Sequence, residues 1–240
     1  MLHPWGEPVS ADTGLLVLRN RAYDCGYSPA LFIARWSTYL FTPVAAGRAA
    51  RHSGGFRADP RLAPATGPLP ADYHGLWKRD RTGFDRGHQA PDATLKAFGS
   101  KAQAETYYLS NITPQYSLFN QGFWRELETR TRSWAGKRDT VWVVTGPVFL
   151  AEHETLRVGA RNLISVPHAY FQVAARKRPS SVLALLVPHV SRSMPWDSAG
   201  AFLVAVDSVE KLTGLTIFPD MNDSLTPACS LSWPGLPVLR

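Results

Sequence analysis

The sequence is poor in cysteine and has no long apolar run. Only Cys25 and Cys229 occur among its 240 residues, and they lack the paired spacing of a zinc site. They fit either one disulfide that ties the ends of the chain or two reduced thiols. No apolar run approaches the ~18 residues of a membrane-spanning helix. The N-terminal residues also lack the basic and apolar segments of a signal peptide, so neither feature is expected.

The motifs of several common enzyme classes are also absent. There is no glycine-rich loop ending in Lys-Ser or Lys-Thr, no Gly-x-Ser-x-Gly elbow and no His-Glu-x-x-His helix. These absences argue against a P-loop enzyme, an α/β-hydrolase and a zincin. Gly-x-Gly patterns are missing as well, which argues against dinucleotide binding.

The composition predicts one folded domain with a basic surface. Apolar residues make up 45% of the chain and charged residues 19%, which fits a sizeable core and argues against global disorder. We expect a single domain over residues 1–240, with 1–14 and 220–240 as peripheral tails. Lys plus Arg is 26 against 19 for Asp plus Glu, a net charge of +7. This surplus favours a polyanionic partner, although a merely soluble basic protein would show it too.

The spacing of apolar residues predicts an α+β fold with a central, mainly antiparallel sheet flanked by helices. Strands are predicted where β-branched and aromatic residues form short apolar runs. These runs are 15–18, 31–41, 107–109, 141–145, 169–175, 182–187 and 215–218. Helices are predicted in pieces over 92–107, with a break near Gly99, and over 120–134 and 201–213.

A long irregular segment is predicted between residues 43 and 71. Proline and glycine recur through it, and Arg48, Arg51, Arg57 and Arg61 are spaced along it. Loops of this length in a compact domain are usually functional or disordered. The arginines fit either phosphate contacts or a solvated surface loop.

His88 stands in the setting of a catalytic histidine. It follows Asp85, Arg86 and Gly87, which predict a charged turn, and Pro91 comes shortly after it. Glycine permits close backbone approach, and a neutral imidazole is well suited to deprotonate an attacking water. A lone histidine is more often structural or exposed, so it is the surrounding sequence that singles out His88.

The strongest helix prediction covers residues 120–134 and places three polar residues along one edge. At about 100° per residue, Asn120, Glu128 and Arg132 flank an apolar face. A carboxamide oxygen suits Mg²⁺, a carboxylate can hold metal-bound waters, and a guanidinium can reach a phosphate. The same residues also fit a helix N-cap followed by a surface ion pair. The apolar face consists of Phe123, Trp124, Leu127 and Trp134.

Three ordered blocks of sequence resemble the DNA/RNA non-specific endonuclease family. They are residues 85–91 (DRGHQAP), 109–115 (LSNITPQ) and 120–122 (NQG), and weaker similarity covers most of residues 15–220. This family, which includes secreted sugar-non-specific nucleases and endonuclease-G-like enzymes, has a ββα-metal fold. The resemblance therefore implies that fold and a Mg²⁺ cofactor, which Mn²⁺ or another divalent cation can replace.

The resemblance also implies roles for individual residues. His88 would be the general base and Asn120 the direct metal ligand, while Glu128 would order the metal's water shell. Arg132 would stabilise the transition-state phosphate or the leaving group. Asn111 would orient the site.

Three further positions complete the implied set. Asp85 and Arg86 would shape the segment around His88. The family also uses an arginine from the loop before this motif, for which Arg57 is the first choice and Arg51 the alternative.

The predicted function is metal-dependent cleavage of DNA and RNA that leaves 5′-phosphates. Little sequence preference is expected, because contacts to backbone phosphates carry no base code. Two alternatives stay open: a non-cleaving nucleic-acid-binding module of the same fold, and a phosphodiesterase for a small substrate. Because an ungated nuclease would be lethal in its own cytosol, we expect export, an organelle, or an inhibitor or gating protein.

Overall fold

The computed structural model describes residues 2–42, 54–135, 140–177, 180–221, 233 and 235–237. Arg48, Arg51 and Cys229 lie outside these residues. Cys25 is a buried free thiol, and its burial raises its pKa. No helix in the described part of the chain is long and apolar enough to cross a membrane.

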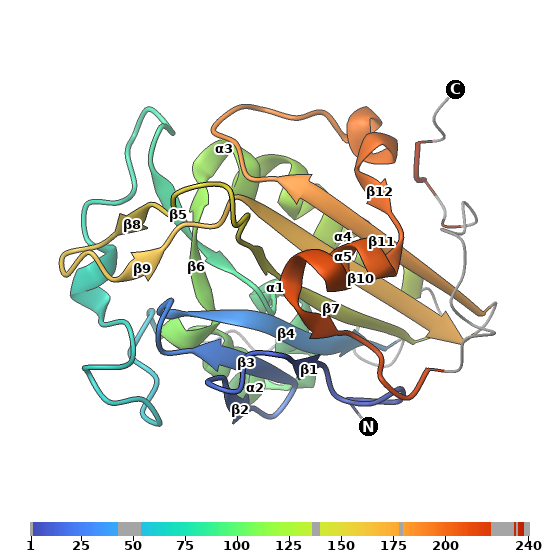
Figure 1. Cartoon of the computed structure of the whole chain (residues 1–240), viewed down its shortest axis with the longest axis horizontal. Helices are drawn as coiled ribbons and strands as arrows, with labels where there is room; N and C mark the ends of the chain where they lie inside the picture. Colours follow the sequence, from blue (N-terminus) through green and yellow to red (C-terminus); the bar gives the residue numbers. More distant parts are fainter. Residues whose placement is uncertain are drawn as a thin grey trace.

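The centre of the molecule is a seven-stranded sheet (Figure 1). Its strand order is β12-β11-β10-β7-β4-β3-β2, and every neighbouring pair is antiparallel. The prediction of a central antiparallel sheet is therefore confirmed. Its strands are β2 (Leu16–Arg19), β3 (Tyr23–Ser28), β4 (Ile33–Phe41), β7 (Val141–Val148), β10 (Ala169–Lys177), β11 (Ser180–Pro188) and β12 (Leu203–Val204).

Two-stranded ribbons and short helices surround this sheet. The ribbons pair β1 (Val9–Ser10) with β13 (Leu215–Thr216), β5 (Phe84–His88) with β6 (Ile112–Tyr116), and β8 (Arg157–Val158) with β9 (Ile164–Ser165). The α-helices are α1 (Asp92–Leu95), α2 (Ser100–Thr106), α3 (Ser117–Phe119), α4 (Arg125–Ala135) and α5 (Val206–Thr213). The 3-10 helices are η2 (Pro70–Tyr73), η3 (Lys96–Phe98), η4 (Leu109–Asn111) and η6 (Trp196–Phe202), and η5 (Asn120–Trp124) is a π-helical turn.

Both faces of the sheet are covered. In Figure 1, α4 lies behind the sheet and α5 in front of it. Along β7, Val143 packs into one apolar cluster and Val144 into another, and both side chains are fully buried. Because successive side chains of a strand point to opposite faces, a strand covered on both faces is expected to be mainly apolar. The valines of β7 meet this expectation, and the buried hydroxyl of Thr145 donates to the carbonyl of Phe171.

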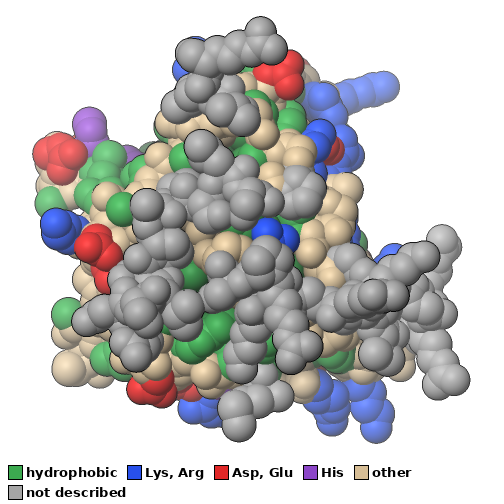
Figure 2. Space-filling view, turned by 90° about the vertical axis from the view of Figure 1, so that its right-hand side faces the viewer, with side chains coloured by type: hydrophobic (Ala, Val, Ile, Leu, Met, Phe, Trp, Pro, Cys, Tyr) green, Lys and Arg blue, Asp and Glu red, His purple; other side chains and the backbone are tan. Residues whose placement is uncertain are grey.

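Charged side chains of both signs lie on the face that Figure 2 shows. Among the described side chains visible there, those of Lys and Arg lie around the rim, interspersed with those of Asp and Glu. No single field of positive charge covers the described surface in this view.

Most predicted strands are confirmed, and several are longer than predicted. β10 and β11 contain the predicted runs 169–175 and 182–187. β7 continues past Thr145 because Gly146 and Pro147 keep their register with β10. The prediction of a strand over 107–109 is wrong: Tyr108 makes one isolated bridge to Arg57, and the next residues turn as η4.

Two other predictions need correction. Residues 85–87 do not form a turn but belong to strand β5, because their backbone pairs with β6 along its whole length. The helix predicted over 201–213 begins only at Val206, since the preceding residues form η6 and β12. It ends as predicted, with Gly214 in the left-handed conformation at φ 67°.

His189 fastens the β5–β6 ribbon to the central sheet. It follows β11, and its Nε2 accepts a hydrogen bond of 2.8 Å from the backbone N–H of Tyr116. Its Nδ1 donates to the carbonyl of Pro167 at 2.8 Å. This pair of bonds requires the neutral ring. The ring packs against Phe119 and Tyr170, and burial lowers the pKa of His189 to about 4.

Replacing His189 with glutamine is expected to remove part of the pH dependence of stability. The imidazole titrates near pH ~6.5 in an unfolded chain but with a pKa of about 4 in the folded protein. In the wild type, the contribution of neutral His189 to the free energy of unfolding is therefore complete above pH ~6.5. It is lost as the pH falls toward 4, by about 3 kcal/mol in total. Urea unfolding of both proteins between pH 4 and 7 measures the difference. Parallel pH profiles would contradict the assignment, since His88 and the other titrating groups are common to both proteins.

Candidate active site

The candidate site is built by β5, β6 and the helix that follows them. The two strands pair with Asp85 opposite Gln115 and His88 opposite Ile112. From Tyr116 the chain passes directly into α3, η5 and α4. The first two sequence blocks, residues 85–91 and 109–115, therefore lie side by side, and with the helix that follows they have the strand–strand–helix order of a ββα unit.

Gly87 is required by the packing of Gln115 across the ribbon. A Cβ atom on Gly87 would lie 2.2 Å from the Cδ and Oε1 atoms of the buried Gln115 side chain. Atoms at that distance overlap, so a larger residue would displace Gln115 or push the strands apart. The glycine of the motif thus serves strand pairing and not a turn.

The buried carboxylate of Asp85 joins the ribbon to the helix. Its Oδ1 accepts a hydrogen bond from Ser117 Oγ at 2.6 Å. Its Oδ2 accepts bonds from Asn120 Nδ2 and Gln121 Nε2, both at 2.8 Å. Because Asp85 binds the amide nitrogen of Asn120, the amide oxygen is the part of that side chain that remains to act as an acceptor. Oxygen is the donor that a hard cation requires.

Asn120 lies just before a kink between two helical segments. Gly122 at the kink has a non-helical backbone, with φ −104° and ψ −110°. Kinks of this kind commonly occur at glycine. The helix begins at Ser117, before the predicted start, and its predicted apolar face is confirmed. The buried members of that face are Phe123, Trp124, Leu127 and Trp134.

His88 lies at the end of β5 between two aromatic rings. The centroids of Phe56 and Tyr107 are 5.4 Å and 5.3 Å from the centroid of the imidazole. Its Nε2 is buried and has no hydrogen-bond partner among the described residues. Burial lowers the pKa of His88 to about 4, an effect that the nearby charge of Asp92 opposes. The ring is therefore neutral at pH 7 and able to accept a proton.

Glu128 and Arg132 lie one turn apart on α4. Burial raises the pKa of Glu128 to about 8, and the positive charge of Arg132 partly offsets this effect. The Nη2 of Arg132 donates to Thr129 Oγ1 at 2.8 Å, and its Nη1 lies 3.5 Å from Thr94 Oγ1 on α1. The predicted polar edge of the helix is thus present, with both side chains partly buried.

Five of the predicted residues line two adjoining cavities, whereas Arg132 lines neither of them. His88, Asn120 and Glu128 line a cavity of about 240 Å³. A second cavity of about 520 Å³ shares Asn120 with the first and is also lined by Asp85 and Arg86. The donor set of the first cavity fits a hard divalent cation, because it offers amide and carboxylate oxygens and no sulfur.

Asn111 lies beneath the site and does not line either cavity. Its Oδ1 accepts from the N–H of Ala90, and its Nδ2 donates to the carbonyls of Ala90 and Thr106, at 2.9, 2.9 and 3.0 Å. The fully buried side chain therefore fixes the segment just after His88 to the end of α2. The orienting role that the family resemblance implies for Asn111 stays a prediction.

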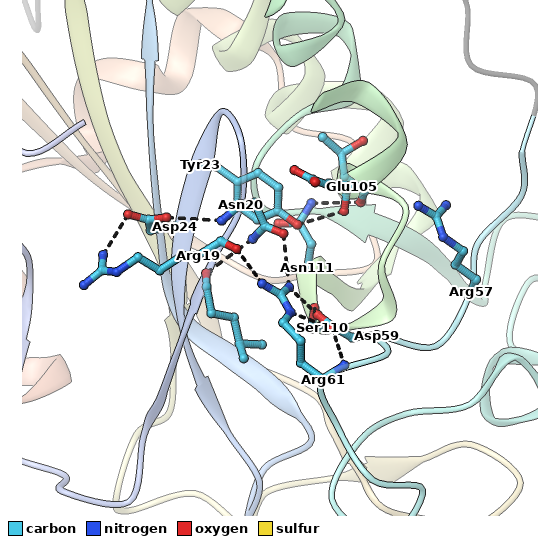
Figure 3. A network of polar contacts seen from close by, with 12 residues as sticks. Arg19, Asn20, Tyr23, Asp24, Arg57, Asp59, Arg61, Glu105, Ser110 and Asn111 are labelled. Carbon is cyan, nitrogen blue, oxygen red and sulfur yellow. Dashed lines mark hydrogen bonds and ion pairs between the residues drawn. The ribbon is translucent and has the colours of Figure 1, made fainter. Parts of the chain in front are cut away.

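Arg57 does not reach the cavities. Its Nη2 donates to the carbonyl of Ala104 at 2.6 Å, and its guanidinium lies 4.4 Å from the ring centroid of Tyr108. In Figure 3 it lies apart from the neighbouring pair of Asp59 and Arg61. Its side chain thus braces α2, whereas the preceding residue, Phe56, contacts His88.

The polar network in Figure 3 holds this same region in place. The buried carboxylate of Asp59 accepts hydrogen bonds from Arg61 and from Ser110 Oγ, both at 2.6 Å through Oδ2. Tyr23 on β3 donates to the carbonyl of Glu105 at 2.9 Å. The segment that carries Asn111 is therefore tied both to the loop before the motif and to the central sheet.

Three polar residues that the sequence analysis did not single out also line the smaller cavity. They are Asp92, Gln121 and Arg125. Gln121 is next to Asn120, so its position in the third sequence block (residues 120–122) was a usable signal. Asp92 and Arg125 carry no comparable signal, because isolated charged residues at helix starts are common.

Comparison with known proteins agrees with this geometry. The family model for the DNA/RNA non-specific endonucleases matches residues 8–224. Human mitochondrial nuclease EXOG is 32% identical over 96% of this chain and 64% of its own length. The nuclease of Serratia marcescens is 32% identical over 96% of this chain and 85% of its own. Human mitochondrial endonuclease G is 32% identical over 87% of this chain and 71% of its own.

The fold is similar to that of a solved nuclease. The crystal structure of the EndoG/EndoGI complex, which concerns the mechanism of EndoG inhibition, contains a chain with a TM-score of 0.74 to this one. The two are 27% identical, and the match covers 86% of each chain. This likeness confirms the ββα-metal nuclease fold. The chain belongs to the DNA/RNA non-specific endonuclease family, a family of hydrolases that act on nucleic acids.

Proposed function

We propose that this chain hydrolyses phosphodiester bonds of DNA and RNA with little sequence preference and leaves 5′-phosphate ends. The proposal is supported above all by the meeting of His88, Asn120 and Glu128 at one cavity. These residues supply a neutral base, an amide oxygen and a carboxylate, which together suit metal-assisted attack of water on a phosphate. The chain spans 64% of human EXOG, so activity is proposed for this chain and not taken over from the longer relative.

His88 is proposed as the general base. Its Nε2 is free of protein hydrogen bonds among the described residues, and the rings of Phe56 and Tyr107 hold the imidazole in place. The imidazole removes a proton from the attacking water as the water oxygen bonds to phosphorus. The P–O3′ bond breaks, the 3′ oxygen leaves with the electron pair and takes up a proton from solvent, and the ring releases the proton it gained to solvent.

Asn120 and Glu128 are proposed to hold the divalent cation, Mg²⁺ or, in its place, Mn²⁺ or another divalent ion. Asn120 would bind it directly through its amide oxygen, and Glu128 through water. When bound, the cation neutralises charge on the phosphate and on the leaving oxygen. A nearby positive charge also favours the ionised form of a carboxyl group such as that of Glu128, whose burial alone raises its pKa.

The remaining residues are proposed to position these groups or to bind phosphate. Arg132 stabilises the transition-state phosphate, and the exposed Arg86 binds a phosphate at the adjoining cavity. Asp85 orients Asn120. Asn111 and Arg57 act as positioning residues, because their side chains donate to the carbonyls of Thr106 and Ala104, just before Tyr107.

We also propose that this activity is kept from the nucleic acids of its own cell by export, an organelle or a protein inhibitor. Two of the relatives described above are mitochondrial nucleases by name. The similar solved structure is that of EndoG bound to EndoGI. Both facts support separation or inhibition as a means of control in this family.

Replacing His88 with alanine is expected to lower the cleavage rate of plasmid DNA and of RNA by at least about 100-fold, the range for loss of a general base. Steady-state rates with Mg²⁺, and with EDTA as the metal-free comparison, measure the effect. Leu156→Ala serves as the matched control, because Leu156 is 54% exposed and is not part of the site. Full activity of His88→Ala would refute the mechanism.

Replacing Asp85 with asparagine is expected to raise the Mg²⁺ concentration for half-maximal rate about 10- to 100-fold, as for other partners that orient metal ligands. One amide oxygen cannot serve three donors, so Asn120 loses its fixed orientation. Asp207→Asn, which changes an exposed carboxylate on α5, provides the charge-matched control. If Asp85→Asn keeps its fold by circular dichroism and shows the wild-type Mg²⁺ requirement, Asp85 does not orient the ligand.

A further inference from the structure

A short loop over residues 76–83 carries the most exposed aromatic side chain in the described part of the chain. Trp77 is 57% exposed, and Lys78, Arg79 and Arg81 around it are exposed as well. The loop lies between η2 and β5, at the upper left of Figure 1. An exposed aromatic ring among cations offers a stacking face beside charges that attract phosphate, the combination found in proteins that bind single-stranded nucleic acid.

The conformation of the loop is well defined. Its two ends are joined by the hydrogen bond from the N–H of Phe84 to the carbonyl of Leu76, at 2.8 Å, and its turn by the bond from Arg81 to Lys78, at 3.0 Å. Arg81 has φ 63°, a conformation that is uncommon for a non-glycine residue. The loop therefore presents Trp77 on a closed turn.

The loop is attached directly to the metal-binding helix. The guanidinium of Arg81 donates to Gln121 Oε1. Gln121 in turn donates from Nε2 to Asp85, the carboxylate that orients Asn120. This chain of hydrogen bonds sets the position of the loop relative to the proposed metal ligand.

Trp77 lines the larger cavity together with three other rings. Phe56, Tyr73 and Phe84 supply the rings, and the guanidinium of Arg86 lies 5.1 Å from the ring centroid of Phe56. The volume of about 520 Å³ falls within the ~300–1,000 Å³ typical of sites for small ligands. Asn120 and Gln121 line this cavity and also the smaller one at His88, so a strand whose phosphate lies at His88 places its adjacent nucleotide here.

The charges around this cavity favour an anionic chain. Lys78, Arg79 and Arg86 are exposed cations, and they outnumber the two nearby carboxylates, whose hydrogen bonds fix their positions. Asp80 accepts two hydrogen bonds from Thr82, and Asp85 accepts three from its own neighbours. Aromatic faces combined with cations are what proteins use to bind single-stranded nucleic acid, since every base can stack on a ring.

We propose that the cavity between Trp77 and Phe56 receives one unpaired nucleobase of the substrate strand, next to the phosphate that is cleaved. The proposal rests on the proposed nuclease function and adds the form of substrate to it. A paired base cannot enter a cavity lined by rings without leaving its stack. Single strands and locally opened duplexes are therefore bound more tightly than intact duplex, whatever their sequence.

Binding is tested with a fluorescently labelled single-stranded 12-mer and with a 12-mer of the same backbone that lacks every base. Fluorescence anisotropy is measured in EDTA with His88→Ala protein, so that no strand is cut. Trp77→Ala in this background is expected to weaken binding of the normal 12-mer about five- to hundredfold, the range for one lost stacked base. Binding of the abasic 12-mer is expected to stay within about twofold. Trp77→Phe, which keeps a ring, is expected to restore most of the affinity.

The controls separate this inference from the nuclease proposal. Leu156→Ala removes another exposed apolar side chain and should leave both affinities unchanged. Cleavage of plasmid DNA by wild-type protein with Mg²⁺ reports the nuclease function independently of Trp77. If the wild type cleaves but Trp77→Ala weakens both 12-mers equally, or neither, base stacking at Trp77 is refuted while the nuclease function stands. If the wild type does not cleave, the proposed function fails whatever the 12-mers show.

Discussion

The site depends on one buried carboxylate. Asp85 accepts three hydrogen bonds, from Ser117, Asn120 and Gln121, and all three donors belong to the helix while Asp85 belongs to the strand. A buried charge without partners would be strongly destabilising, so the strand and the helix must meet in this one arrangement to satisfy it. The same bonds decide which end of the Asn120 amide is available to a cation. A single interaction thus fixes both the local fold and the chemical character of the site.

Burial has the same effect on the two titrating groups beside Asn120. It lowers the pKa of His88 to about 4 and raises that of Glu128 to about 8, so in both cases it favours the neutral form. A neutral imidazole is the form that a general base needs. On the proposed function, a cation would favour the ionised form of Glu128 and an anionic phosphate the protonated form of His88, so each group could take the charge that the reaction requires.

The sequence predicted which residues of the helix lie together better than it predicted the strand pairing and the loop contacts that hold them. The apolar period of the helix placed Asn120, Glu128 and Arg132 on one edge because helical spacing is a local property. The charged residues before His88 favoured a turn by local preference, but pairing with β6 decided the outcome, and only the packed structure shows that Gly87 makes room for Gln115. The loop arginines had no period at all, so nothing local told Arg57, which braces α2, from residues that bind substrate.

The role of Trp77 could not be predicted from the sequence either. The sequence does not show whether a tryptophan is exposed or buried, and the basic residues beside Trp77 fit an ordinary solvated turn. Two long-range contacts indicate a role for Trp77. Arg81 of the same loop bonds to Gln121, and Asn120 and Gln121 line both the cavity at Trp77 and the cavity at His88. The interior of the site holds its groups by buried hydrogen bonds that salt does not screen. The outer part offers rings and solvated cations, which in the proposed function would bind an unpaired strand of any sequence. In that proposal the interior fixes the chemistry and the outer part fixes the form of the substrate.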